Sequence, residues 1–280
     1  MSGDEVAEAR GALAAVAPEP GVAKPDATLT VEGIVRSFGG LTAVDVERLE
    51  VQRHTITALI GPNGAGKTTL FNVLTGFDHA DRGDWYLDGT PLRGLPAYRI
   101  ARLGMVRTFQ LTKALAGMTV LDNMMLGASE QPGERLSVSL LRFAWGSRER
   151  EVRERALALL DDFGLAAKRK DLAATLSGGQ RKLLEMARAL MVEPRLLMLD
   201  EPMAGVNPAL VQSLLDHVRR LRDEGVTIVF VEHDMDVVMN ISDWVVCMAE
   251  GSVIAEGPPN VVAGNEAVID AYLGRRRGIA

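Results

Sequence analysis

The sequence predicts an α/β fold in which helices cover a mainly parallel β-sheet. Short, mainly apolar runs at residues 56–60, 196–199 and 226–231 have the length and composition of buried parallel strands. Residues 208–222, between the last two runs, repeat apolar side chains at helical spacing. The chain has 280 residues, 47% of them hydrophobic, which is enough for a large core. Alternation of strand and helix indicates a parallel sheet.

We expect residues 1–27 to form a flexible tail. Residues 11–17 are apolar and rich in alanine, but three acidic residues and one arginine precede them, which is the wrong charge for a secretory signal. Pro18, Pro20 and Pro25 follow at close spacing. A segment of this composition is typical of disorder, and its sequence indicates no function.

Strand patterns come first after this tail. Residues 28–36 and 42–51 alternate in polarity and are separated by a turn at residues 38–40. Residues 68–75, after the apolar run that ends at position 60, predict a helix. Residues 85–87, followed by Asp-Gly, predict a further strand and its turn.

The middle of the chain is mainly helical from residue 97 to residue 163. One helical face carries Val152, Ala156, Leu159 and Phe163. Gly164 is placed to end that helix. We therefore expect a helical subdomain over roughly residues 90–185, inserted in a domain that spans residues 28–257. Residues 258–280 would form a C-terminal helical extension.

Charge and composition exclude several classes of protein. The net charge of -6 and the pI near 5.4 argue against a nucleic-acid-binding surface. No run approaches the roughly 20 apolar residues that span a bilayer, so we expect a soluble chain whose membrane role would come through a partner. The single cysteine, Cys247, lies in an apolar run, which fits a buried thiol in a reducing cytosol.

A phosphate-binding loop follows the strand at residues 56–60. Residues 61–68 fit the pattern G-x-x-x-x-G-K-[ST] and precede a predicted helix, which is the required context. The loop amides and the helix N-terminus supply positive potential to phosphate oxygens. Lys67 should reach the β- and γ-phosphates, and the Thr68 hydroxyl should bind Mg²⁺. An accidental glycine-rich turn would match in about one chain in a hundred of this size. The residues assigned to the nucleotide here are Gly61, Pro62, Asn63, Gly64, Ala65, Gly66, Lys67, Thr68 and Thr69.

Two carboxylates end the apolar run at residues 196–199. A pair of acids at the end of a buried strand is costly unless a cation matches it. Asp200 is placed to hold Mg²⁺, and Glu201 is the candidate general base for attack on the γ-phosphate. Strands often end in polar residues for no functional reason, and that interpretation would be preferred if the phosphate loop were absent.

A second anion-binding feature opens another predicted helix. Ser177 is a good N-cap, and Gly178 and Gly179 leave their amide groups unobstructed ahead of Gln180. A helix N-terminus presented in this way favours an anion. A helix cap alone would explain Ser177, but not two glycines and a glutamine in series.

These three motifs together resemble those of the nucleotide-binding subunits of ABC transporters, from Val31 almost to the C-terminus. The resemblance implies a P-loop NTPase (RecA-like) core with a mainly parallel sheet, an antiparallel β subdomain and an inserted helical subdomain. It also implies that two chains face head to tail, with each ATP between the phosphate loop of one and the Ser177–Gly179 segment of the other. The second chain could be identical or a homologue.

The resemblance assigns further residues. Phe38 matches the aromatic residue that stacks on adenine, although a lone aromatic residue is more often part of a core. Gln110 matches the glutamine that links the nucleotide and its metal ion to the helical subdomain and takes part in catalysis. His233 matches the histidine that contacts the γ-phosphate. Asn207 departs from the aspartate that many relatives carry in the loop that crosses the dimer.

Several stretches are similar to the branched-chain amino acid (Liv-type, G-like) import ATPases. This branch implies separate membrane permease subunits, an extracytoplasmic substrate-binding protein, and a peripheral location at the cytoplasmic face of the membrane. Liv-type members often replace the first glycine of the Ser-Gly-Gly segment, whereas this chain keeps Gly178. The stretches are residues 106–110, 118–120, 204–208, 232–235 and 271–274.

Other functions remain open alternatives. Lipopolysaccharide-export ATPases share much of the same framework, so a lipid exporter remains an alternative. A soluble ABC ATPase acting on ribosomes or DNA usually has two such domains or a long coiled coil, and neither pattern occurs here. A regulatory subunit without turnover is disfavoured by the intact Lys67, Asp200, Glu201 and His233. The sequence does not identify the solute, which could be an amino acid, urea, an amide or a lipid.

Overall fold

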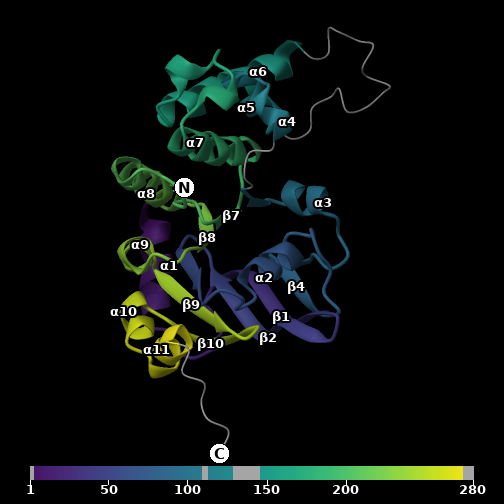
Figure 1. The fold of residues 1–280 in the computed structure, drawn as a ribbon, viewed down its shortest axis with the longest axis vertical. Coiled ribbons are helices and arrows are strands. Elements are labelled where there is room, and N and C mark those ends of the chain that lie inside the picture. Colours follow the sequence, from purple (N-terminus) through teal and green to yellow (C-terminus); the bar gives the residue numbers. More distant parts are fainter. Residues whose placement is uncertain (1–2, 109–112, 129–145, 274–280) are drawn as a thin grey trace, which may run out of the picture. The chain divides into compact units, whose positions relative to one another are not determined.

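The computed structural model describes residues 3–108, 113–128 and 146–273, and the chain divides into two compact units (Figure 1). The sheet unit comprises Met1–Arg107, Arg195–Pro202 and Val218–Ala280. The helical unit comprises Thr108–Pro194 and Met203–His217. It thus starts later than the expected position near residue 90, and it includes a second segment after residue 185.

A six-stranded, mainly parallel sheet forms the centre of the sheet unit, which confirms the fold class. The strand order is β10-β9-β3-β8-β7-β6, and every neighbouring pair is parallel except β10 with β9. The strands are β3 (Ile56–Ile60), β6 (Met105–Arg107), β7 (Leu196–Asp200), β8 (Thr227–Val231), β9 (Trp244–Ala249) and β10 (Ser252–Gly257). Strand β6 lies in a stretch expected to be helical. Its three residues are too few to show a periodicity, and its pairing with β7 determines its conformation.

A second, antiparallel sheet has the order β2-β1-β4-β5. Its strands are β1 (Ala27–Phe38), β2 (Leu41–Gln52), β4 (Arg82–Leu87) and β5 (Thr90–Pro91). Strands β1 and β2 confirm the strands that the alternating pattern predicted, and β4 confirms the strand expected at residues 85–87.

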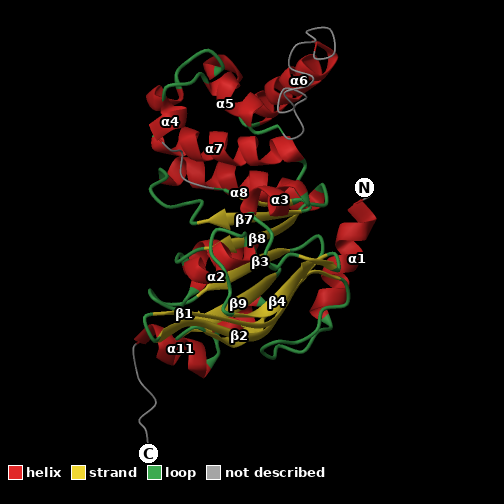
Figure 2. Ribbon diagram, turned by 90° about the vertical axis from the view of Figure 1, so that its right-hand side faces the viewer, coloured by secondary structure: helices red, strands yellow, loops and turns green. Residues whose placement is uncertain are grey.

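Helix α2 (Lys67–Leu74) packs within a core that both sheets share (Figure 2). Leu70 and Phe71 of α2 belong to the same buried cluster as Val31 of β1, Leu59 of β3 and Met198 of β7. Besides α2, the described part of this unit contains α1 (Gly3–Ala14), α3 (Ala97–Arg102), α9 (Met235–Ile241), α10 (Pro259–Ala263), α11 (Glu266–Leu273) and the last turns of α8 (Pro208–Asp223).

The N-terminal segment differs from the flexible tail that the sequence predicted. Helix α1 (Gly3–Ala14) buries Val6, Ala9 and Leu13, which follow one another at helical spacing on one face. Arg10 Nε donates to Asp243 Oδ1 at 2.7 Å, which ties α1 to the residue before β9. The prolines that suggested disorder follow this helix and do not interrupt it.

The helical unit packs α5, α6 and α7 against one another. Met124, Leu160 and Leu184, one from each helix, are fully buried. The buried face of α6 therefore uses Leu160, whereas Leu159 is half-buried. The helices are α4 (Lys113–Ala116), α5 (Val120–Leu126), α6 (Gly146–Asp162), α7 (Gly178–Ala189) and α8 (Pro208–Asp223), whose last turns belong to the sheet unit; 3₁₀ turns span Ala166–Lys168, Ala173–Thr175 and Leu190–Val192.

Across the described residues, no helix combines the length and the apolar character needed to cross a membrane.

Candidate functional site

The phosphate loop joins β3 to α2 and needs its glycines for two different reasons. Gly61 has φ +146°, and a Cβ atom there would lie 2.1 Å from the carbonyl oxygen of Met248. Gly66 has φ +97°, and its Cβ would lie 2.3 Å from the carbonyl oxygen of Ala43. A Cβ on Gly64 would meet open space within the described part of the chain. Gly61 and Gly66 therefore allow close backbone packing, while Gly64 leaves room for a ligand.

The loop and two distant residues line one pocket of about 210 Å³ within the sheet unit. Glu201 follows β7 and His233 follows β8, and these strands are neighbours in the parallel sheet. Because the carboxyl ends of parallel strands meet at one sheet edge, both side chains reach the phosphate loop. The lining residues are Ala43, Asn63, Gly64, Ala65, Gly66, Lys67, Thr68, Thr69, Glu201 and His233.

Lys67 is held against its own loop. Its Nζ donates to the carbonyl oxygens of Gly61 at 2.7 Å and Pro62 at 3.0 Å. Burial lowers the pKa of Lys67, and the negative charges of Glu201 and Asp200 oppose that shift. An ammonium group has three N–H donors, so Lys67 can bind a phosphate oxygen and keep these contacts.

Glu201 and His233 contact each other directly. His233 Nε2 lies 2.7 Å from Glu201 Oε1, at hydrogen-bond distance. Glu201 has φ +46°, in the left-handed region, and its N–H donates to the carbonyl oxygen of Val231 at 3.1 Å. Strained backbone of this kind concentrates at functional sites, where neighbouring structure holds it.

Arg107 is a site residue that the sequence analysis did not single out. Its Nη2 donates to Asp200 Oδ2 at 2.5 Å and its Nη1 to Asn72 Oδ1 at 2.6 Å. The Arg107 side chain is 6% exposed and that of Asp200 is 25% exposed. A basic residue beside the acidic end of β7 could have been predicted only if β6 had been recognised as its neighbour.

The oxygen groups near the loop fit a magnesium ion. Mg²⁺ usually takes one or two protein oxygens and completes its shell with phosphate oxygens and water. The Thr68 hydroxyl and the Asp200 carboxylate are such groups. Among the described residues, no group of three or more His, Cys, Asp or Glu side chains could hold a metal by itself. Gln110, the third expected ligand, lies outside the described residues.

The second predicted anion site opens α7 in the helical unit. Ser177 Oγ accepts the N–H of Gln180 at 3.2 Å, and Gln180 Oε1 accepts the N–H of Ser177 at 3.0 Å, which together form a capping box. A Cβ on Gly179 would lie 2.5 Å from Leu210 Cδ1, whereas one on Gly178 would be at ordinary contact distance, 3.5 Å from the carbonyl oxygen of Gly205. Gly179 therefore allows helix packing, and Gly178 is the exposed member of the pair.

Phe38 ends β1 and is 48% exposed, so it is not a core residue. The Arg36 guanidinium carbon lies 4.4 Å from the centre of its ring. An exposed aromatic ring of this kind can stack on a planar ligand.

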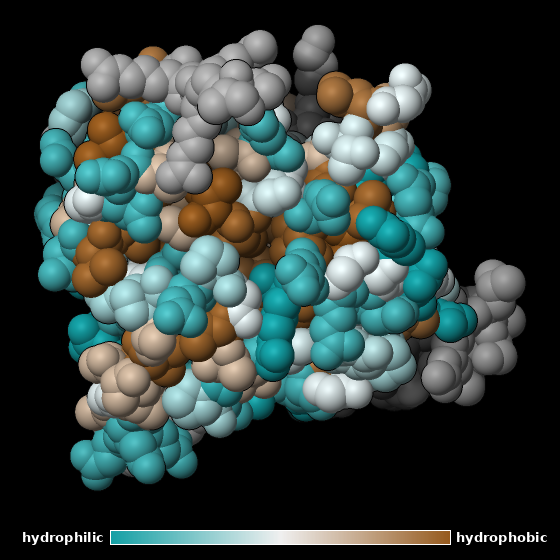
Figure 3. Space-filling view, turned by 90° about the horizontal axis from the view of Figure 1, so that it is seen from below, coloured by the Kyte–Doolittle hydropathy of each residue, from teal (hydrophilic) through white to brown (hydrophobic). Residues whose placement is uncertain are grey.

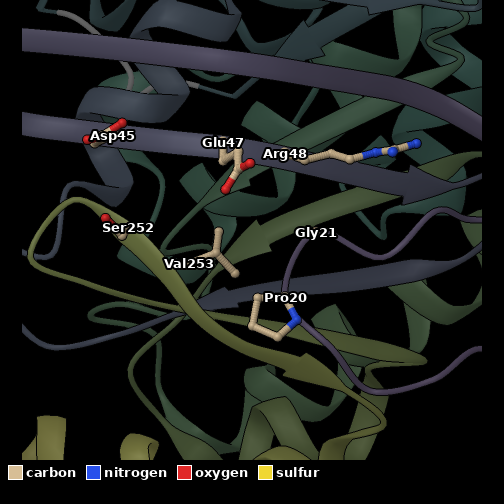
Figure 4. A pocket seen from close by; sticks show the side chains of 7 residues that line it. All are labelled: Pro20, Gly21, Asp45, Glu47, Arg48, Ser252 and Val253. Atoms are coloured by element: carbon tan, nitrogen blue, oxygen red, sulfur yellow. The ribbon is translucent and has the colours of Figure 1, made fainter.

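A larger pocket of about 420 Å³ lies elsewhere in the sheet unit (Figure 4). Pro20 and Gly21 form one side of it, and Asp45 and Glu47 contribute two carboxylates. Arg48 also lines the pocket, and its guanidinium is paired with Glu50 at 2.5 Å. The two carboxylates therefore leave an excess of negative charge, which disfavours a polyphosphate. Its size therefore does not make it the nucleotide site.

Comparisons with known proteins agree with this geometry. Residues 45–204 match the family model described as ABC transporter, and residues 252–277 match the model described as branched-chain amino acid ATP-binding cassette transporter. The chain is 42% identical over 246 residues to the probable branched-chain amino acid transport ATP-binding protein LivG of Archaeoglobus fulgidus, covering 88% of this chain and 95% of that relative. It is 42% identical over 248 residues to the high-affinity branched-chain amino acid transport ATP-binding protein BraF of Pseudomonas aeruginosa, covering 88% and 97%.

Two solved structures are similar over nearly their whole length. A nucleotide-free ATP-binding cassette from an ABC transporter superposes with a TM-score of 0.78 at 38% identity, covering 88% of this chain and 98% of that one. The ADP conformation of an ATP-binding cassette of an ABC transporter gives a TM-score of 0.78 at 38% identity, covering 89% and 99%.

Proposed function

The chain belongs to the ABC transporter family as an ATP-binding subunit and ATPase, and on this premise we propose that it hydrolyses Mg²⁺-bound ATP to drive import of branched-chain amino acids or a related small polar solute. The observation that carries the proposal is the pocket that joins the phosphate loop to Glu201 and His233. Support for this solute comes from the relatives, which serve branched-chain amino acid transport, and from the family match at residues 252–277.

The loop residues would bind the triphosphate. Lys67 supplies a positive charge, and the amide groups between Asn63 and Thr69 supply further donors. Thr68 and Asp200, together with Gln110, would hold Mg²⁺, which supplies charge neutralisation at the β- and γ-phosphates. Phe38 would stack on the adenine.

Glu201 would act as the general base. Its carboxylate accepts a proton from the water that attacks the γ-phosphate, and His233 at 2.7 Å fixes the orientation of that carboxylate. His233 would also contact the γ-phosphate, and Gln110 would help to position the water and the metal ion. Positioning and electrostatic stabilisation contribute most of the catalysis in phosphoryl transfer.

A second chain would complete each nucleotide site. The exposed N-terminus of α7, with Ser177 and Gly178, is a phosphate-binding element without a lysine of its own. Two chains arranged head to tail would place it, with Gly179 and Gln180, against the nucleotide held by the phosphate loop of the other. The second chain is either a copy of this one or a homologous ATPase.

The remaining partners would be integral membrane permease subunits and an extracytoplasmic substrate-binding protein. The chain would then be a peripheral subunit at the cytoplasmic face of the membrane. Support comes from the relatives, which are ATP-binding proteins of branched-chain amino acid transport. The helical unit would contact the permease and pass the nucleotide state to it through Gln110.

Nucleotide binding is tested with Lys67→Ala and a matched control, Lys170→Ala, which changes an exposed lysine of the helical unit. We expect Lys67→Ala to lose measurable ATP binding in titration calorimetry, and Lys170→Ala to bind as the unchanged protein does. Equal binding by both variants would contradict the assigned site.

The transported solute is tested separately in proteoliposomes that contain the permease subunits and the substrate-binding protein. We expect uptake of labelled leucine that requires ATP, stops with Lys67→Ala and is competed by valine and isoleucine. Uptake of labelled leucine that unlabelled leucine, valine and isoleucine all leave unchanged would contradict the proposed solute class.

A further inference from the structure

The C-terminal helix α11 reaches the phosphate loop through one side chain. The N–H of Gly61 donates to the hydroxyl oxygen of Tyr272 at 2.9 Å, across 211 positions of sequence. Both residues belong to the sheet unit. The first residue of the loop is therefore held by the last helix of the chain.

Gly61 is a residue that needs such a partner. Its φ of +146° is open to glycine alone, and the close approach of the Met248 carbonyl oxygen excludes any side chain. Glycine has the widest conformational range of any residue, so contacts must fix its peptide groups. Tyr272 binds its N–H, and Lys67 Nζ binds its carbonyl oxygen at 2.7 Å. The hydroxyl of Tyr272 and the ammonium of Lys67 thus act on the same residue.

The Tyr272 hydroxyl keeps its proton at neutral pH, because its pKa is raised above the ordinary value. Burial raises the pKa of Tyr272, and the nearby Cys247 raises it further, against the opposing effect of the Gly61 hydrogen bond. A neutral phenol can accept the Gly61 N–H through a lone pair while it adds no negative charge beside a polyphosphate.

Helix α11 rests on the sheet unit by one face only in its described residues. Val268 is its buried residue, whereas Ile269, Tyr272 and Leu273 are 43%, 41% and 63% exposed, so that Tyr272 buries part of its ring and its hydroxyl end. Figure 3 views the end of the molecule at which α11 lies in Figure 1, and apolar patches alternate there with hydrophilic side chains. Because α11 buries so little apolar surface, the hydrogen bond from Gly61 to Tyr272 is a specific link between this helix and the phosphate loop.

We infer that Tyr272 is a positioning residue for the nucleotide: its hydroxyl holds Gly61, and through Gly61 the phosphate loop and Lys67, in the geometry that binds phosphates. This inference rests on the proposed nucleotide site. It adds a residue from the C-terminal helix to a site that is otherwise built from the phosphate loop and the ends of β7 and β8.

The test is Tyr272→Phe, which keeps the ring and removes the hydroxyl. The matched control is Tyr98→Phe, which removes a hydroxyl from a tyrosine of α3 that is 56% exposed. Titration calorimetry gives the dissociation constants for ATP and ADP, steady-state kinetics give KM and kcat, and a thermal melt checks folding. We expect Tyr272→Phe to weaken ATP and ADP binding about 3- to 10-fold, the effect of losing one partly buried hydrogen bond. The value of kcat at saturating ATP should stay within about twofold, and Tyr98→Phe should match the unchanged protein.

A second readout is amide hydrogen exchange at Gly61, which should be faster in Tyr272→Phe than in the control. Unchanged affinity in Tyr272→Phe would overturn the inference, as would a loss of kcat and thermal stability at unchanged affinity. If the unchanged protein itself failed to bind ATP, the proposed function would fall. If Tyr272→Phe and the unchanged protein both bound ATP normally, the role of Tyr272 would be contradicted and the proposed function would stand.

Discussion

Cys247 lies on β9, beside the end of the strand that carries the phosphate loop. Burial raises its pKa from 9.0 to about 12, and the positive charge of Lys67 opposes that shift. Between pH 9 and pH 12 the unfolded chain therefore loses the thiol proton before the folded chain does. Since the unfolded state then binds fewer protons, this residue makes the free energy of unfolding fall as the pH rises through that window.

We predict that Cys247→Ala shows a smaller loss of stability between pH 8.5 and pH 10.5 than the unchanged protein. Urea unfolding at about six pH values in this range measures the difference. Iodoacetamide at pH 8 should label Cys247 in urea but not in the folded protein, because the thiolate is the reactive form. Rapid labelling of the folded protein would contradict the buried, protonated thiol.

Several site residues could be predicted individually, and others could not. Lys67 and Thr68 lie in a contiguous motif whose chemistry is local, so the sequence indicates them directly. Arg107 and Tyr272 reach the site through strand pairing and through a helix far along the chain. Such contacts depend on tertiary structure, and one sequence carries no local signal for them.

At the scale of single elements, the two glycines at the start of α7 differ in role: Gly179 allows close helix packing, and Gly178 is exposed. Gly178→Ala introduces a methyl group that the chain itself has room for, and alanine is the better helix former. We predict that this variant keeps its melting temperature but loses ATPase activity by roughly tenfold or more, since about 1.4 kcal/mol of lost contact with the partner's nucleotide has that effect.

The control for Gly178→Ala is Gly117→Ala in the same unit. A Cβ on Gly117 would meet open space within the described residues, so this substitution also introduces a methyl group without a clash. Gly117→Ala should leave ATPase activity unchanged. Full activity of Gly178→Ala, measured under conditions in which the unchanged protein dimerises, would contradict the role given to the α7 N-terminus.

Helix α1 should contribute to stability, since it is not a flexible tail. Leu13 is 2% exposed and belongs to the main buried cluster. We predict that Leu13→Ala lowers the free energy of unfolding by about 2–5 kcal/mol. Glu8→Ala, at an exposed position of the same helix, should change it by less than about 0.5 kcal/mol. Equal stability of the two variants in urea unfolding would contradict the packing of α1.

Elements with a strong repeating pattern were predictable, and those that depend on a partner element were not. Strands β3, β7 and β8 have mainly apolar patterns and helix α8 has a long one, and the structure has all four close to the expected bounds. Strand β6 has three residues and forms through pairing with β7. Helix α1 has apolar residues at helical spacing, but the prolines that follow it are typical of disorder and favour the prediction of a flexible tail.

At the scale of the whole molecule, each unit carries one part of the proposed phosphate-binding site. The sheet unit holds the phosphate loop with Glu201 and His233, and the helical unit holds the N-terminus of α7. We propose that two chains combine these two parts around each ATP, so that the bound ATP links the two chains. Binding of ATP should therefore bring the two chains together, and hydrolysis should let them separate.

The most direct test is the molar mass of Glu201→Gln in solution, measured by light scattering with and without Mg²⁺-ATP. Removing the general base should slow hydrolysis by roughly 10²–10⁴ and leave ATP bound. We predict twice the monomer mass of 30.2 kDa with ATP, and the monomer mass with ADP or when Lys67→Ala is added. Glu201→Gln that binds ATP and yet stays monomeric at saturating ATP would contradict a site shared between two copies of this chain.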